Sequence, residues 1–98
     1  MEERAYYVYI MMNKWRTVSY IGMTNDLARR VIEHREGIVD GFTKRYRCHD
    51  LVYYECCNEV MGALSREKEL KKWSRMKKWA LIKQQNPDLR DLSLECFV

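Results

Sequence analysis

The chain has 98 residues, enough for one domain with one hydrophobic core and too few for a second. Hydrophobic residues make up 47% and charged residues 33%, and one proline and four glycines exclude collagen-like and low-complexity classes. The formal net charge is +4, and no apolar run approaches the roughly 20 residues that a membrane span needs. Residues 1–4 (MEER) do not open a signal peptide, so we expect a cytoplasmic protein.

The first two predicted elements are strands that form a hairpin. Residues 6–12 (YYVYIMM) are a continuous run of strand formers that is too short for a typical helix. Residues 17–23 resume this pattern after a polar break. In a hairpin without a bulge, a turn centred between Lys14 and Trp15 would pair Tyr9 with Tyr20 and place both on one sheet face.

The rest of the chain alternates between helical and strand patterns. Asp26 and the two polar residues before it can cap a helix that ends at Gly37, and Pro87 stops the last helix. The order β-β-α-β-α-α predicts an α+β domain with helices against a mainly antiparallel three-stranded sheet. The remaining elements are a helix over 27–36, a basic loop or short helical turn over 41–47, a strand over 51–57, helices over 59–73 and 75–85, and an extended tail with apolar anchors over 87–98.

Positive charge is concentrated near the C-terminus. Residues 66–83 hold eight basic and two acidic residues, a local charge of +6, which leaves −2 on the other 80 residues. A basic helical segment that contains Trp73 and Trp79 suits the phosphates of a nucleic acid. The alternative is a solvated helix face, with the tryptophans packed in the core.

The four cysteines do not form a metal-binding or disulfide pattern. There is no C-x-x-C spacing, and Cys56 and Cys57 on a strand would point to opposite faces. Cys48 and His49 are neighbours and not ligands at a zinc spacing. We therefore expect reduced, largely buried thiols.

A carboxylate stands beside the apolar stripe of the helix predicted over 59–73. Glu67 lies three residues from both Leu64 and Leu70, and an unpaired carboxylate in that position costs several kcal/mol. Either it turns outward to meet Lys71 or Arg66 in water, or a divalent cation compensates its charge.

The helix predicted over 27–36 also carries unusual polar residues. Arg30 and His34 project from the same half of this helix, where the arginine suits phosphate oxygens and the histidine can transfer a proton. The simpler alternatives are a surface ion pair for Arg30 and a helix-dipole contact for His34. If both helices pack on the face that bears Tyr9 and Tyr20, these residues and Glu67 converge as a centre for metal-assisted phosphodiester hydrolysis.

Several motifs in order resemble one known family. Tyr7-Val8-Tyr9 is followed eleven residues later by Tyr20-Ile21-Gly22, then by the segments 24–34, 41–46, 66–73 and 86–87. This set, which reaches to about Asp91, is similar to the GIY-YIG nuclease domain and most of all to its small bacterial single-domain members. Tyr7 departs from the motif, which has a small glycine there.

The resemblance implies the site residues and their roles. It implies a nuclease-like domain over 1–86, followed by a tail over 87–98, with a three-stranded antiparallel sheet flanked by helices. Glu67 would bind a single divalent ion, Mg²⁺ or Mn²⁺, and Arg30 would be the catalytic arginine. The other matching positions are Tyr9, Tyr20, Gly22, His34 and, at a looser spacing, Asn86.

We therefore expect metal-dependent hydrolysis of nucleic acid, DNA rather than RNA, in single-stranded or structured form. Tyr9 is the favoured general base with His34 as proton relay, although Tyr20 is not excluded, and Gly22 lets backbone approach closely. Candidate phosphate contacts are Lys44, Arg45, Lys71, Lys72, Arg75, Lys77 and Lys78.

Two other classes stay open at this point. One is a non-catalytic nucleic-acid-binding module on the same fold, and the other is an interaction domain with a basic helix. In either case we expect no membrane contact and a monomer or weak dimer. Since the chain has no separate targeting domain, its own surface or a protein partner would select the target.

Overall fold

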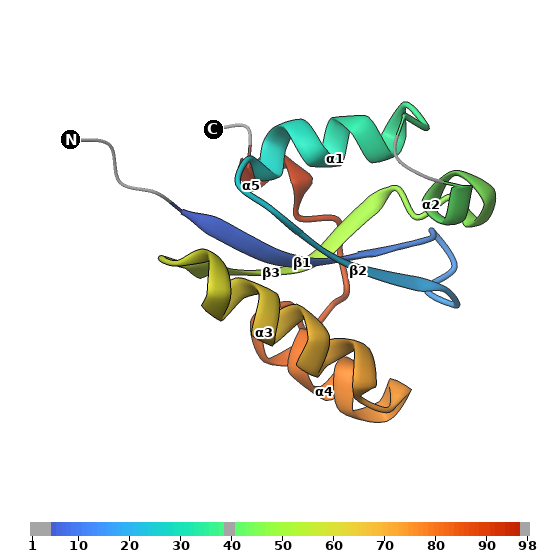
Figure 1. The fold of residues 1–98 in the computed structure, drawn as a ribbon. Helices are drawn as coiled ribbons and strands as arrows, with labels where there is room; N and C mark the ends of the chain where they lie inside the picture. Colours follow the sequence, from blue (N-terminus) through green and yellow to red (C-terminus); the bar gives the residue numbers. More distant parts are fainter. Residues whose placement is uncertain (1–4, 39–40, 97–98) are drawn as a thin grey trace.

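A three-stranded antiparallel sheet separates two layers of helices in the computed structural model, which describes residues 5–38 and 41–96 (Figure 1). The sheet has the strand order β2-β1-β3, with β1 in the centre. One face is covered by α1, with α2 and α5 beside it, and the other face by α3 and α4. The elements are β1 (Tyr6–Met12), β2 (Ser19–Thr24), α1 (Leu27–Arg35), α2 (Gly41–Tyr46), β3 (Asp50–Cys57), α3 (Val60–Lys72), α4 (Arg75–Gln85) and α5 (Ser93–Cys96).

The expected α+β class and antiparallel three-stranded sheet are confirmed. Two short helices are added to the expected order, because the basic segment 41–46 is a helix and the tail ends in α5. The tail is held against the body, since the Leu92 amide donates to the Leu51 carbonyl at 2.7 Å and the Leu92 side chain is buried. The described part leaves out residues 1–4, the last two residues of the expected tail and the side chain of Cys96, one of the four cysteines.

The hairpin register differs by two residues from the expected pairing. Tyr9 lies opposite Gly22, and Tyr20 lies opposite Met11, so the expected pairing of Tyr9 with Tyr20 is wrong. The loop is longer because the Asn13 side chain accepts hydrogen bonds from the backbone amides at positions 17 and 18, at 2.8 and 3.0 Å. A shift of two residues preserves the alternation of faces, so Tyr9 and Tyr20 still share one face.

The strand alternation divides the apolar side chains between two cores. Val8 and Ile10 of β1 pack with Leu70 of α3 and Ile82 of α4. Tyr9 faces the other way and packs with residues of α1. The two-sided burial of β1 explains its continuous apolar sequence.

The tryptophans pack against the core, and the described cysteines differ in exposure. Trp73 and Trp79 are half-buried and pack against the core on the α3–α4 side, as one alternative expected. Cys48, Cys56 and Cys57 carry free thiols. Cys48 is buried and Cys57 is half-buried, but Cys56 is exposed, so the expectation of buried thiols is wrong for Cys56. Within residues 5–38 and 41–96, no helix has the length and apolar character required to cross a bilayer.

Candidate active site

The two helices that carry the predicted site residues lie on opposite faces of the sheet. Arg30 and His34 belong to α1, on the tyrosine face, whereas Glu67 belongs to α3 on the other face. The condition that both helices pack on the tyrosine face is therefore wrong. Glu67 is nevertheless close enough to Tyr9 for its negative charge to contribute to the raised pKa of that tyrosine.

Helix α1 is positioned by its cap and its apolar stripe. The Asp26 carboxylate accepts a hydrogen bond from the Arg29 amide at 3.1 Å and satisfies one open N–H of the first turn. Leu27 and Val31 are buried against the sheet. His34, one turn after Arg30, is also buried, and it lies in the last turn of α1, where the alternative of a helix-dipole contact places it.

A chain of hydrogen bonds runs from Arg30 to α2 through the buried Tyr9. Arg30 Nε, which can only donate, lies 3.3 Å from the Tyr9 hydroxyl, so the tyrosine oxygen accepts there. The Tyr9 hydroxyl then donates to His34 Nε2 at 2.8 Å. His34 Nδ1 carries the ring proton and donates to Thr43 Oγ1 at 3.0 Å. The phenol proton of Tyr9 thus has a histidine nitrogen as its direct acceptor.

The environment of Tyr9 disfavours its ionised form. Burial raises the pKa of Tyr9 to about 12, and the charges of nearby Tyr20 and Glu67 act in the same direction. The hydrogen bond and positive charge of Arg30 oppose this shift without cancelling it. Tyr9 is therefore neutral at physiological pH in the protein alone.

Gly22 is required by the close approach of Tyr9. A Cβ at this position would lie 2.5 Å from Tyr9 Cζ, closer still to the tyrosine oxygen, and 3.0 Å from Tyr20 Cε1. Both tyrosine rings thus occupy the space that a side chain would take. Here the missing side chain makes room for the Tyr9 and Tyr20 rings, whereas the expected close approach of the backbone to a substrate stays a prediction.

Arg30 and Glu67 each also make an ordinary ion pair. Arg30 Nη1 lies 3.4 Å from Glu33 Oε1, and Glu67 Oε1 lies 3.7 Å from Lys71 Nζ. These are the surface pairs that the simpler alternatives expected. Neither pair excludes a second role, since Arg30 also binds Tyr9 and 19% of the Glu67 side chain is exposed to solvent.

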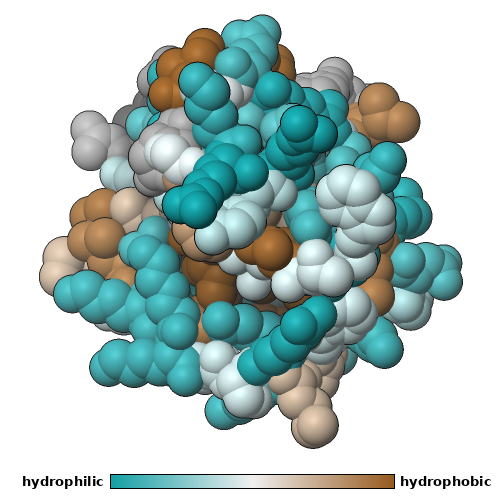
Figure 2. All heavy atoms as spheres, turned by 90° about the vertical axis from the view of Figure 1, so that its right-hand side faces the viewer, coloured by the Kyte–Doolittle hydropathy of each residue, from teal (hydrophilic) through white to brown (hydrophobic). Residues whose placement is uncertain are grey.

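A pocket of about 270 Å³ opens beside Tyr20. Its lining includes Tyr20 and Phe42 and two of the predicted phosphate contacts, Lys71 and Lys78. The face at the α2 end of the molecule has hydrophilic side chains around a hollow in which apolar side chains are exposed (Figure 2). Tyr20 is therefore the site tyrosine that borders open space, whereas Tyr9 is enclosed.

Aromatic rings continue from the tyrosines onto α2. The Tyr20 ring lies 5.2 Å from the His34 ring and 6.0 Å from the Phe42 ring, and Phe42 lies 4.8 Å from Tyr46. The sequence-based reasoning missed Phe42 and Thr43 as members of this group. The spacing of four between Phe42 and Tyr46, which puts both on one helix face, was the available signal.

The other predicted phosphate contacts lie on the surface of α2 and of the α3–α4 segment. Lys77 Nζ is 4.2 Å from the Trp73 ring, and the Arg75 guanidinium is 5.7 Å from the Trp79 ring. These cations cover the tryptophans, which makes base stacking on the two rings a poor fit. Lys44, Arg45 and Lys72 are exposed.

Asn86 has contacts that belong to the fold. Its buried amide donates to the Val52 carbonyl at 3.0 Å and to the Arg90 carbonyl at 2.8 Å, and it accepts from the Arg90 amide. These bonds end α4 and direct the tail back along β3. A site role for Asn86 stays a prediction.

The donor set around Glu67 fits a hydrated divalent ion. Within residues 5–38 and 41–96, no three His, Cys, Asp or Glu side chains gather around one point. Both ring nitrogens of His34 are already hydrogen-bonded and Glu33 is paired with Arg30, whereas Glu67 is a partly exposed carboxylate whose charge acts on Tyr9. Mg²⁺ keeps several waters and needs only one or two protein carboxylates, so one carboxylate suits it.

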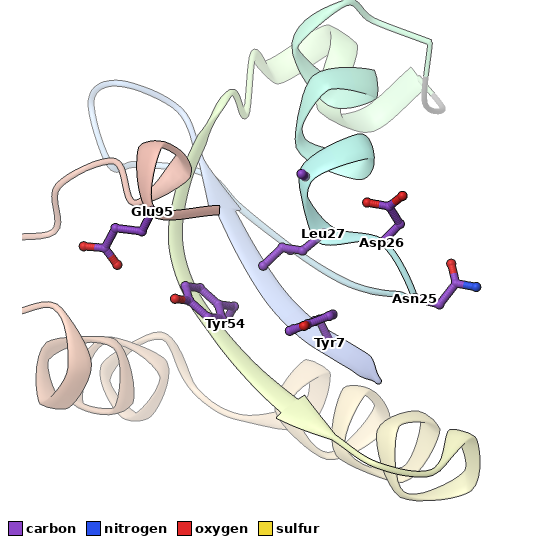
Figure 3. Close-up of a pocket in the computed structure, with 7 residues that line it drawn as sticks. Tyr7, Asn25, Asp26, Leu27, Tyr54 and Glu95 are labelled. Carbon is purple, nitrogen blue, oxygen red and sulfur yellow. The ribbon is translucent and has the colours of Figure 1, made fainter. Parts of the chain in front are cut away.

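A separate pocket of about 340 Å³ lies at the start of α1 (Figure 3). Tyr7 and Tyr54 form its floor as an edge-to-face pair with centroids 6.5 Å apart. Its carboxylates have partners, since Asp26 caps α1 and Glu95 pairs with Arg90. The lining holds none of the predicted site residues, so this pocket is not the candidate active site.

Comparisons with known proteins agree with the fold. The chain is 40% identical over 83 residues to a UPF0213 protein of Syntrophus aciditrophicus, covering 84% of this chain and 93% of that protein. It is 38% identical over 79 residues to a UPF0213 protein of Haloquadratum walsbyi, covering 81% and 88%. The solution NMR structure of a UPF0213 protein from Bacillus halodurans matches with a TM-score of 0.56 and 30% identity over 86% of this chain and 88% of that one. The family model of the GIY-YIG catalytic domain matches residues 5–80, and the chain therefore belongs to the GIY-YIG family.

Proposed function

We propose that this protein is a metal-dependent nuclease that hydrolyses phosphodiester bonds in nucleic acid, DNA rather than RNA. The observation that carries the proposal is the hydrogen-bonded group of Arg30, Tyr9 and His34 beside a pocket lined by Tyr20 and two lysines. Membership of the GIY-YIG catalytic domain family supports the same class of reaction.

In this proposal Arg30 carries the fixed positive charge of the site. Its Nε donates to the Tyr9 hydroxyl, while Nη1 lies 3.4 Å from Glu33 Oε1, which is long for an ion pair. A phosphate that reaches the site would compete with Glu33 for the guanidinium, whose fork of donors matches phosphate oxygens. Arg30 would then stabilise the negative charge that develops on the phosphorus oxygens.

The two tyrosines would have different tasks. Tyr9 is enclosed and neutral, so it would orient Arg30 and His34 through its hydroxyl, while Thr43 holds the other ring nitrogen of His34. Tyr20 borders the open pocket and is the better placed phenol to meet the attacking water. This modifies the expectation from sequence, which favoured Tyr9 as the general base.

Glu67 would hold one Mg²⁺ or Mn²⁺. The partial exposure of its carboxylate leaves an oxygen accessible, and its long ion pair with Lys71 is easily exchanged. The bound ion would supply Lewis-acid polarisation of the phosphate and positive charge that favours an ionised phenol. Lys71, released from Glu67, would be available to a substrate phosphate.

The lining of the pocket suits an unpaired strand. Tyr20 and Phe42 offer ring faces for bases, and Lys71 and Lys78 offer charge for the backbone. We therefore propose a single-stranded or structured DNA substrate. Lys44, Arg45, Lys72, Arg75 and Lys77 would add phosphate contacts outside the pocket.

The second candidate is a nucleic-acid-binding module without catalysis. The ion pair between Glu67 and Lys71 favours this second candidate, because a helix surface without any catalytic role would contain the same pair. A cleavage assay separates the two candidates.

The assay uses labelled single-stranded, duplex and branched oligodeoxynucleotides with Mg²⁺ or Mn²⁺. Wild-type protein should cut at least one of them, and Glu67→Gln should lose at least a hundredfold in rate while it unfolds at the wild-type temperature. Glu59→Gln is the matched control, because Glu59 precedes α3, is exposed, and makes no side-chain cap hydrogen bond. Equal cutting by wild type and Glu67→Gln refutes the proposal, and binding without any cutting supports the second candidate.

A further inference from the structure

An exposed tryptophan stands outside the tyrosine site. Trp15, in the turn between β1 and β2, is 63% exposed. It lines a pocket of about 450 Å³ together with Lys14 of the same turn and Arg47, His49 and Asp50 of the segment between α2 and β3. None of these residues takes part in the proposed chemistry.

The turn that carries Trp15 is firmly held. The Asn13 side chain bonds three groups at positions 17 and 18. Arg16 adopts a left-handed backbone conformation with φ of 59° and donates to the Asp50 carboxylate at 2.7 Å and to the Leu89 carbonyl at 2.9 Å. The indole is therefore presented by a rigid loop, which lowers the entropy cost of binding.

The opposite wall of the pocket is also held by backbone contacts. The Cys48 amide donates to the Thr43 carbonyl at 3.1 Å, and the Arg35 side chain donates to the His49 carbonyl at 3.0 Å. Arg47, between α2 and these contacts, has a left-handed φ of 54°. Its exposed side chain is thus anchored to a fixed backbone next to α2.

The charge of the pocket is positive. Arg16 neutralises Asp50, the one acidic residue of the lining. Neither Lys14 nor Arg47 forms an ion pair with a carboxylate in the described part of the chain. Lys14 Nζ itself lies 4.9 Å from the centroid of the Trp15 ring, a single cation contact, whereas Trp73 and Trp79 each carry two. An indole that is 63% exposed, with Lys14 on the ring and Arg47 in the same pocket, fits a nucleotide whose base stacks on the ring and whose phosphate meets these cations.

We propose that this pocket binds a nucleotide of the substrate strand that flanks the cleaved bond. The inference rests on the proposed function, because α2 connects the two places. Phe42 in the first turn of α2 contacts Tyr20, and Arg47 follows its last residue. Phe42 and the last residue of α2, Tyr46, are four residues apart, a rise of about 6 Å, which is on the order of two stacked nucleotides at 3.4 Å per step. The pocket thus extends the binding surface beyond the reaction centre.

The test measures binding without cleavage. Fluorescence anisotropy in EDTA compares wild type with Trp15→Ala, Trp15→Phe and Arg47→Ala, using a labelled single-stranded oligodeoxynucleotide. Trp15→Ala should weaken binding about tenfold and Trp15→Phe should retain most of the affinity, since stacking on an aromatic ring contributes about 1–3 kcal/mol per base. Arg47→Ala should lower the slope of log affinity against log salt by about one.

The controls distinguish this inference from the proposed function. Met76→Ala changes a side chain that is 84% exposed on α4 and should leave binding unchanged. If Trp15→Ala and Arg47→Ala both bind with wild-type affinity, the pocket does not bind the strand, even if the protein cuts DNA. The absence of wild-type binding at low salt also refutes the inference. Equal affinity for a free deoxynucleoside monophosphate and for the strand also overturns it, because the site would then serve a small molecule. A protein that binds as expected and never cuts overturns only the nuclease proposal.

Discussion

Replacing Gly22 by alanine tests the close packing of the two tyrosines. The added Cβ would lie 2.5 Å from Tyr9 Cζ and 3.0 Å from Tyr20 Cε1, well inside van der Waals contact. Tyr9 cannot move aside freely, because it is fully buried and its hydroxyl is bonded to His34 and Arg30. Overpacking of this kind costs about 1–3 kcal/mol, which corresponds to a fall of roughly 5–20 °C in Tm for a domain of this size.

The matched control is Gly62→Ala on α3. A Cβ there would meet only the Glu59 side chain, at 3.6 Å, which is ordinary contact. Because alanine is the better helix former, this substitution should stabilise the protein by about 0.5–1 kcal/mol. Denaturant unfolding and thermal melting measure both variants, and the cleavage assay should show a loss for Gly22→Ala alone. Wild-type stability and activity of Gly22→Ala would refute the proposed packing.

Three further predictions concern the hydrogen-bonded chain and the lysines. Because the pKa of Tyr9 is raised to about 12 from an unfolded value near 10, its contribution to stability is complete below pH 10 and is lost as the pH rises toward 12. Denaturant unfolding across this pH range should show a smaller loss of unfolding free energy in Tyr9→Phe than in wild type. Equal losses in the two proteins would contradict the raised pKa of Tyr9. Thr43→Val removes the hydrogen bond between Thr43 Oγ1 and His34 Nδ1 and should lower the free energy of unfolding by about 0.5–1.5 kcal/mol, measured by urea unfolding, whereas unchanged stability would contradict the bond. Replacing Lys71 and Lys78 by alanine should lower the salt slope of oligonucleotide binding by about one per lysine, and an unchanged slope would exclude both from the interface.

The elements with strong local signals could be predicted from the sequence. The bounds of β1 are those of its apolar run, and α4 ends at Gln85, before Asn86-Pro87, as expected from the restriction that proline imposes. The hairpin register could not be predicted in the same way. It depends on the side-chain hydrogen bonds of Asn13, which lengthen the loop by a mechanism that turn spacing does not reveal.

The arrangement of the candidate site residues could be predicted only in part. Helical periodicity indicates which side of a helix is buried, but not which face of the sheet it covers, so Glu67 was assigned to the wrong layer. Thr43 was missed because its bond to His34 joins two separate helices. Tyr9 is enclosed and Tyr20 borders a pocket because of how separate helices and strands pack around them. Such packing cannot be predicted from a local sequence pattern.

The central claim is that Glu67 supplies the metal site of a nuclease centre. Mn²⁺ binding, followed by electron paramagnetic resonance in the same samples in which strand cleavage is timed, tests it most directly. We expect one Mn²⁺ per chain in wild type and in Glu59→Gln, with a cleavage rate that follows occupancy, and the loss of both in Glu67→Gln. Cleavage that persists in EDTA, or Mn²⁺ binding that Glu67→Gln leaves unchanged, would contradict it.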